Sequence, residues 1–283
     1  MGLIIVGIIL IIVGAGLIWG RISALNKAQQ IKTAEHRTVA ELQEMSKEIA
    51  AELGRGSYNE IVEVRGRIEC DRPLTSELTK TECVYYRMKV DQEYEETYQQ
   101  WDESRKQHVM RTRRTTRNMA SNNRSVPFDL RDETGAVEVL PDGADIEAEK
   151  VLSSFEPENR LLGRGGTTIS FGGFSLELGG FRGGGSRILG YRLEEHALPV
   201  GRDVYVLAEA SDAEGRLTLH KPASKKKSRF IITTQSKEAL IQSVQRSALF
   251  FLIGSIASFL IGAGLLIGRS EEHTSELQSH SFI

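Results

Sequence analysis

Two uncharged apolar runs, one near each end of the chain, constrain the fold more than any other feature of the sequence. The first occupies residues 3–19 and the second residues 248–267. A helix needs about 17–25 mainly apolar residues to cross a bilayer, so both runs are long enough. No basic residue precedes the first run, which ends in Trp19 and is followed by Gly20 and Arg21, and this is unlike a cleaved signal peptide. We therefore predict transmembrane helices at 1–20 and 248–267.

The residues between these runs form one long loop with basic side chains near both ends. Arg21 and Lys27 follow the first run, and Arg246 precedes the second. Cytoplasmic loops carry an excess of Lys and Arg close to membrane helices. The pattern predicts an integral membrane protein with two spans, whose soluble domain lies in the cytoplasm.

Small residues recur at a spacing of four in the second run, at Gly254, Ser258 and Gly262. Small side chains allow helix backbones to approach closely in lipid. This spacing favours pairing of the helices, either within one chain or between two copies of it.

The composition of the chain excludes several functional classes. The net charge of −2 argues against a globally basic nucleic-acid-binding protein. The two cysteines, Cys70 and Cys83, are too few for a RING finger, a structural zinc site or a disulfide framework. None of the motifs HExxH, GxSxG or CxxC occurs. We expect no catalytic residues, no cofactor and no metal site.

The segment after the first run is rich in helix-forming residues and leads into a β-rich region. We predict a juxtamembrane helix over residues 21–56. Thr38 and Glu41 form a capping-box pattern, which predicts that a helix restarts at Val39. From residue 57 to 235, short alternating strands are separated by turn residues. We predict a mainly β domain, an antiparallel barrel or sandwich with an OB-like barrel as one form of it. Residues 236–268 then read as a helix that leads into the second span.

Residues 91–117 have an acidic first half and a basic second half, which predicts a charged hairpin inserted in the β domain. A turn near Glu103 and Ser104 would place Glu93 opposite Arg114, and Glu96 opposite Arg111. One interpretation is a hairpin that neutralises its own charge. The other is a contact for nucleic acid or lipid, helped by Tyr94, Tyr98 and Trp101. The basic residues that would form it are Arg111, Arg113, Arg114 and Arg117.

Two further segments stand out by composition. Residues 162–190 are rich in glycine, which predicts an insert; they lack the Gly-Lys-Ser/Thr ending of a phosphate-binding loop.

A basic cluster precedes the second span, and it is either an exposed loop or a contact for anionic lipid. The cluster consists of Lys225, Lys226, Lys227 and Arg229.

The last segment, residues 269–283, resembles the in-frame translation of a short-read sequencing adapter. We interpret it as an artefact and assign it no role in the fold. On this interpretation the natural sequence departs from this one at or near Gly268, and a C-terminal domain there would be missing.

Several short motifs between the spans together resemble a known family. They are Pro73-Leu74-x-Ser76, Cys83-Val84-Tyr85-Tyr86-Arg87, Phe128-x-Leu130-x-Asp132-x-x-Gly135, Tyr191-Arg192-Leu193-x-Glu195 and Gly201-Arg202-Asp203. This set resembles the GIDE domain, also called the BAM ("beside a membrane") domain, of membrane-anchored RING E3 ubiquitin ligases. The resemblance implies a domain held between two membrane helices, and prokaryotic relatives of this kind often lack the RING. We expect structural roles, including turns at 132–135 and 195–201, for Cys83, Tyr85, Tyr86, Phe128, Asp132, Gly135, Glu195 and Gly201.

These observations predict a non-enzymatic membrane protein that presents a binding or scaffolding domain. One alternative is a truncated homologue of a RING-type E3 ubiquitin ligase, and another is a module that binds anionic lipid or another polyanion. The expected partners are membrane lipid and either a second protein or another copy of the chain. No nucleic-acid partner is expected, because the chain as a whole is not basic.

Overall fold

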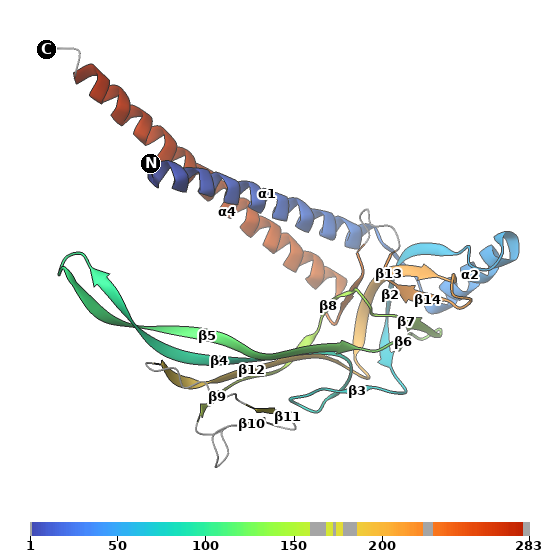
Figure 1. Ribbon diagram of the computed structural model, residues 1–283. Helices are drawn as coiled ribbons and strands as arrows, with labels where there is room; N and C mark the ends of the chain where they lie inside the picture. Colours follow the sequence, from blue (N-terminus) through green and yellow to red (C-terminus); the bar gives the residue numbers. More distant parts are fainter. Residues whose placement is uncertain (1, 159–167, 172–173, 178–185, 223–228, 280–283) are drawn as a thin grey trace. The chain divides into compact units, whose positions relative to one another are not determined.

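The computed structural model describes residues 2–158, 168–171, 174–177, 186–222 and 229–279. The chain divides into two compact units (Figure 1). One unit combines Met1–Ala34 with Gln235–Ile283, and the other is Glu35–Thr234. Most of the glycine-rich insert predicted at 162–190 lies outside the described residues. Within it the structure gives only the short pair β10 (Thr168–Phe171) and β11 (Phe174–Glu177) and the start of the strand that begins at Ser186.

The first unit is a pair of long apolar helices, α1 (Gly2–Thr33) and α4 (Lys237–Ser279). Both are long and apolar enough to cross a membrane, over Ile5–Thr33 and Lys237–Leu265. The helix that starts in the first apolar run continues without a break to Thr33, into the segment predicted to be a juxtamembrane helix. No glycine or proline interrupts residues 21–33, so nothing in that stretch ends the helix.

The small residues of α4 lie against α1. The Ser258 hydroxyl donates a hydrogen bond to the Leu10 carbonyl at 2.8 Å. A Cβ atom added at Gly262 would lie 3.0 Å from the Gly7 carbonyl oxygen, a contact so tight that the backbone of α1 would have to shift to accept a side chain. The helix pairing predicted from Gly254, Ser258 and Gly262 therefore occurs within one chain.

The second unit begins with β1 (Glu35–His36) and a short amphipathic helix, α2 (Val39–Leu53). The predicted capping box is confirmed, because the Thr38 side chain accepts from the Glu41 amide and the Glu41 carboxylate accepts from the Thr38 amide. Val39 and Leu42 are buried in the core of the domain. The helix ends at Gly54, whose φ of 93° lies in the left-handed region that favours glycine.

Five strands of this unit close into a barrel in the order β2–β6–β7–β14–β13–β2. Strands β7 and β14 run parallel, and the other neighbours in the barrel are antiparallel. This is the five-stranded arrangement expected of an OB-like barrel. The strands are β2 (Asn59–Glu69), β6 (Phe128–Arg131), β7 (Ala136–Val139), β13 (Asp203–Ser211) and β14 (Thr218–His220), and β8 (Asp145–Glu147) and β15 (Ile231–Thr233) extend the sheet beyond β13.

A second sheet, an open half-barrel, is built from two excursions of the chain out of the barrel. Its order is β9–β12–β4–β5, and a short strand, β3, pairs with the start of β4. Its strands are β3 (Leu74–Thr75), β4 (Glu82–Asp102), β5 (Gln107–Ser125), β9 (Glu149–Pro157) and β12 (Ser186–Pro199). The prediction of a mainly β domain with a barrel is confirmed.

Each of these two sheets has its own core. Barrel residues such as Val64, Leu130 and Val206 are fully buried together with side chains of α2. Tyr86 and Tyr191 lie in the smaller core of the second sheet. Because side chains alternate between the faces of a strand, the other face of the second sheet is left for polar residues.

Candidate functional site

Glu195 and Asp132 are the two residues carrying the family resemblance whose carboxylates each accept four hydrogen bonds. Glu195 lies within β12, with 0% of its surface exposed, so the predicted turn position is wrong: β12 continues to Pro199. Its carboxylate accepts from the Leu78 and Thr79 amides at 2.8 and 2.9 Å. It also accepts from the Ser76 and Thr79 hydroxyls at 2.9 and 2.5 Å. This carboxylate holds the loop between β3 and β4 against β12, and so joins two motifs that are far apart in the sequence.

Cys83 lies at the start of β4, beside this carboxylate. It is fully buried, and burial, followed by the negative charge of Glu195, raises the pKa of its thiol to about 11. The reactive form of cysteine is the thiolate, which is scarce at neutral pH when the pKa is so high. Its environment is therefore that of a packed thiol and not of a nucleophile.

We expect the two cysteines to react at very different rates with a maleimide reagent. Cys70 is partly exposed and should be labelled in the native protein, whereas Cys83 should be labelled at least about a hundredfold more slowly, because a buried thiol of raised pKa is inert. Mass spectrometry of peptides after timed labelling measures both rates. Denaturation should make the two rates alike, and equal rates in the native protein would contradict the prediction.

Asp132 links the turn between β6 and β7 to the first residues of α2. Its carboxylate accepts from the amide of Val39 at 2.8 Å and from the amides of Thr134 and Gly135 at 2.7 and 2.9 Å. The Thr134 hydroxyl accepts from the Ala40 amide at 3.0 Å. Partial burial alone would raise the pKa of Asp132, but these hydrogen bonds favour the charged form more and lower it.

The expected turn at 132–135 is present, with the Asp132 amide donating to the Gly135 carbonyl at 3.0 Å. A Cβ atom at Gly135 would lie 3.2 Å from Cγ1 of Val39, which leaves little room for a side chain there. The turn is therefore the docking point of α2 on the barrel.

We expect the Asp132→Asn substitution to destabilise the domain by about 1–2 kcal/mol, the usual cost of losing a helix cap. The charged carboxylate stabilises the fold above the pKa of an unfolded aspartate, about 3.9. This contribution should be lost as pH falls through the lower pKa of the native state. Hydrogen exchange of the α2 amides measures the effect. Glu133→Gln, an exposed change in the same turn, is the control and should leave exchange unaltered.

The other residues of the motifs also make packing or backbone contacts. Phe128 is buried in the barrel core and Tyr85 packs against that core. The Tyr86 hydroxyl donates to a Glu77 carboxylate oxygen at 3.0 Å. Gly201 has φ of 81° and its amide donates to the Ile68 carbonyl at 2.8 Å, so it forms the turn before β13. These contacts lie mostly within the barrel or within the second sheet, and all of them are structural.

The charged hairpin predicted at 91–117 is the middle and distal part of β4 and β5 (Figure 1). The register of the two strands is shifted by two residues from the predicted one, so that Glu93 lies opposite Thr116 and not Arg114. Glu95 lies opposite Arg114, and Glu96 lies opposite Arg113. The shift in register comes from the turn between the two strands, where the Asp102 side chain fixes the loop. The Asp102 carboxylate accepts from the amides of Ser104 and Arg105, both at 3.1 Å.

Arginine side chains of β5 pair with carboxylates of β4 and stack on its tyrosines. Arg113 forms an ion pair with Glu96, and Arg114 Nε lies 3.3 Å from Glu95 Oε1. The Arg113 guanidinium lies 5.3 Å from the centre of the Tyr98 ring, and that of Arg117 lies 5.5 Å from the Tyr94 ring. Much of the basic charge is thus neutralised or held against aromatic faces.

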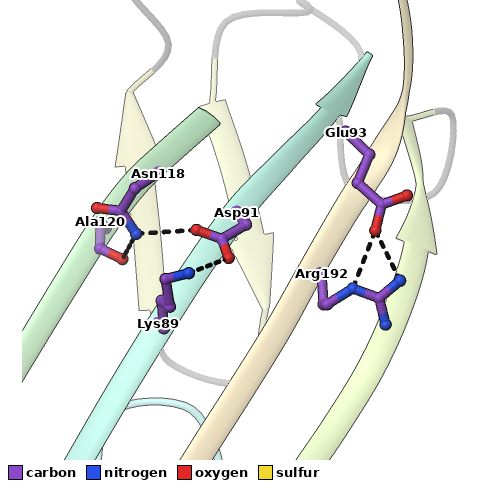
Figure 2. A network of polar contacts seen from close by, with 6 residues as sticks. All are labelled: Lys89, Asp91, Glu93, Asn118, Ala120 and Arg192. Atoms are coloured by element: carbon purple, nitrogen blue, oxygen red, sulfur yellow. Dashed lines mark hydrogen bonds and ion pairs between the residues drawn. The ribbon is translucent and has the colours of Figure 1, made fainter. Parts of the chain in front are cut away.

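A polar network at the base of the hairpin was not predicted from the sequence (Figure 2). Arg192 of β12 donates two hydrogen bonds to Glu93 Oε1, at 2.9 Å from Nε and 2.6 Å from the terminal nitrogen. Beside it, Asp91 pairs with Lys89 and accepts from Asn118 at 3.0 Å. The network connects β12, β4 and β5. The contact between Arg192 and Glu93 depends on the pairing of β12 with β4, which joins residues about a hundred positions apart, and the contact between Asp91 and Asn118 depends on the register of β4 and β5.

The described residues contain no cluster of three or more His, Cys, Asp or Glu side chains that could hold a metal ion. A shallow polar hollow of about 350 Å³ lies on the second sheet, beside Arg87, Lys89 and His196. Of the predicted basic cluster, Lys225, Lys226 and Lys227 lie outside the described residues, and Arg229 is half-buried. The described part of the chain therefore presents this hollow and the charged hairpin as surfaces that a ligand could contact.

Comparison with known proteins connects the chain to a protein family. A family model described as GIDE, E3 Ubiquitin ligase, matches residues 95–268. This range contains Asp132, Glu195 and Gly201, and it begins after Cys83 and Tyr85. No curated protein and no solved structure matches the chain.

Proposed function

Because the chain belongs to the GIDE family, we propose that it is a membrane protein whose two apolar helices hold a β domain that binds a partner protein. The observation that supports this most directly is the pair of long apolar helices flanking the β domain in sequence. The family model matches residues from the β domain into the apolar part of α4, so one family model covers both the β domain and the second apolar helix.

A binding role fits the contacts of the charged and reactive residues. The buried carboxylate of Glu195 is fully used in holding a loop, and burial keeps Cys83 protonated. Among the described residues, a prominent exposed feature is the long hairpin of β4 and β5, which extends past Glu96, the last residue of β4 that pairs with β12. Projecting hairpins of this kind are well placed to contact another molecule.

The experiment that tests this proposal places a photoreactive amino acid at exposed positions of the β domain in the native membrane. We expect the protein to stay in the membrane fraction after alkaline extraction, and crosslinking to give a discrete adduct with another protein. Release of the protein by alkali, or the lack of an adduct from every position tested, would overturn the proposal.

The location of the domain is a second part of the proposal. The basic residues beside the helices favour the cytoplasmic side. Cys70, which is partly exposed, offers a native label for this question. A membrane-impermeant maleimide should label it only after the cell membrane is opened, and labelling in intact cells would reverse the assignment.

The family description as an E3 ubiquitin ligase favours one alternative, a ligase whose RING is encoded beyond Gly268. RING activity requires Cys and His ligands for zinc, and two cysteines do not supply them. Sequencing the gene from original DNA past the codon for Gly268 tests this directly. A cysteine- and histidine-rich segment with zinc spacing there would assign the ligase function.

A further inference from the structure

We propose that the outer edge of β5 binds an acidic, extended segment of a partner protein, which adds to the second sheet as a new strand. The proposal deepens the proposed function, on which it rests, by naming the surface and the chemistry of the partner. It is carried by the topology of the sheet, the charge of β5 and the arrangement of its arginine side chains.

The first observation is that β5 is an edge strand. It pairs with β4 from Gln107 to Ser125, and no other described strand pairs with it. Most of its side chains are exposed. The backbone N–H and C=O groups on the outer side of an edge strand are a template for a further strand, and several protein domains bind extended peptides in this way.

The second observation is the charge of this edge. Strand β5 carries no Asp or Glu, and it has five arginines: Arg111, Arg113, Arg114, Arg117 and Arg124. Apart from Glu103 in the turn, the acidic residues of the hairpin lie on β4. A second copy of β5 placed on this edge would bring arginine against arginine, which is unfavourable. An acidic strand is the occupant that this charge favours.

The third observation is that β4 already shows how an acidic strand pairs with β5. Glu95 and Glu96 lie opposite Arg114 and Arg113 and form ion pairs with them. A guanidinium group has five N–H donors in a planar fork, so one carboxylate leaves donors for another. An acidic strand on the outer edge would repeat the contacts that β4 makes on the inner side.

The arginines also face both sides of the sheet in the way that strand addition requires. Side chains alternate along a strand, so Arg111 and Arg113 lie on one face and Arg114 on the other. Neighbouring acidic residues of an added strand, one on each face, would each meet a guanidinium. Arg111 lies opposite the neutral Tyr98. A hydrogen bond from a serine of the turn is the main cause that lowers the pKa of Asp102, and the charge of Arg111 is only one of several further causes. Arg111 is therefore well placed to gain a carboxylate partner on the outer edge.

A phosphate-rich ligand explains less of this surface. A lipid surface or a nucleic acid could bind the arginines, but it would leave the regular row of backbone donors and acceptors on the edge without partners. An extended peptide satisfies both the backbone and the side chains. The experiment below distinguishes these ligands.

The test uses the full-length protein in nanodiscs of neutral phosphatidylcholine and a labelled peptide that copies residues 92–100, which form the acidic part of β4. Fluorescence anisotropy measures binding. We expect the peptide to bind, and Arg111→Glu to weaken it by about tenfold, because a charge that favours binding becomes one that opposes it. Arg72→Glu, the same charge change at an exposed residue outside β5, should leave binding unchanged.

Two backbone-methylated versions of the peptide test strand addition without any change to the protein. In a strand, N–H groups of alternate residues point to opposite edges. Methylation of one alternate set should abolish binding, and methylation of the other set should preserve it. No binding of the parent peptide, or equal tolerance of both methylated versions, would overturn the proposal.

Two polyanions complete the experiment. A single-stranded oligonucleotide should compete weakly, and vesicles containing anionic phosphatidylglycerol should not displace the peptide. If either competes as well as the unlabelled peptide and methylation has no effect, the edge is a polyanion-binding surface and the proposal fails. Protein crosslinks from other positions of the β domain would still support the proposed function, so the two failures are distinguishable.

Discussion

Replacing Glu195 by glutamine is expected to lower the free energy of unfolding of the β domain by about 3 kcal/mol, because buried donors would lose a charged acceptor. The glutamine side chain has the same size, but one of its two terminal groups is a donor. Oε1 of Glu195 accepts from the Leu78 amide, and Oε2 accepts from Thr79 and Ser76. Either orientation of the glutamine amide therefore sets its NH2 group against at least one buried N–H or O–H group.

The measurement is a urea titration of the protein in nanodiscs, read by pulse proteolysis of the β domain. Glu194→Gln is the matched control, because Glu194 is the neighbouring residue on β12 and points to the opposite, more exposed face. It should change the free energy of unfolding by less than about 0.5 kcal/mol. Equal midpoints for the two variants would show that the Glu195 carboxylate does not hold the loop.

The second large effect is expected in the helix pair. Replacing Gly262 by leucine should force α1 and α4 apart, because even a Cβ atom at this position would lie 3.0 Å from the Gly7 carbonyl oxygen and 3.2 Å from Ile11 Cγ1. Overpacking of this kind costs about 1–3 kcal/mol. In the membrane location proposed above, little hydrophobic force would drive the helices together, so close packing would be a main source of their association.

The readout is crosslinking between cysteines introduced at Leu17 and Gly254, which lie next to each other across the helix pair. The crosslinking is done in a background without Cys70, and a short bifunctional thiol reagent joins the two helices. Gly262→Leu should reduce the yield by about tenfold, as expected for a loss near 1.4 kcal/mol. Gly264→Leu is the control, because a Cβ atom there meets nothing within 4 Å. Equal losses in both variants would rule out specific packing at Gly262.

The parts of the fold that depend on short-range patterns could be predicted from the sequence. The capping box at Thr38 and Glu41 predicted the first residue of α2, because both partners lie within one helical turn. The hairpin of β4 and β5 followed from two oppositely charged halves around a turn. Its register could not be predicted to the residue, because hydrogen bonds from the turn to the Asp102 side chain fix the length of the loop.

The contacts that define the candidate site depend on residues far apart in the sequence. Glu195 is bound by donors more than a hundred residues earlier in the chain, and neither segment alone predicts that they meet. The same holds for Arg192 and Glu93, which face each other only because β12 pairs with β4. The edge position of β5 likewise depends on which strand lies on each side of β4, and no local periodicity carries that information.

The closure of the barrel by β2 and β13 has a consequence for the order in which the chain folds. The two strands pair from Asn59 with Ser211 to Arg67 with Asp203, so the first strand of the barrel meets its last neighbour across most of the domain. At a synthesis rate of about 5–20 residues per second, β2 leaves the ribosome on the order of ten seconds before β13. The hairpin of β4 and β5, made of adjacent segments, can form within microseconds in that interval. The second sheet therefore begins to assemble during synthesis, while the barrel from which it branches is still open.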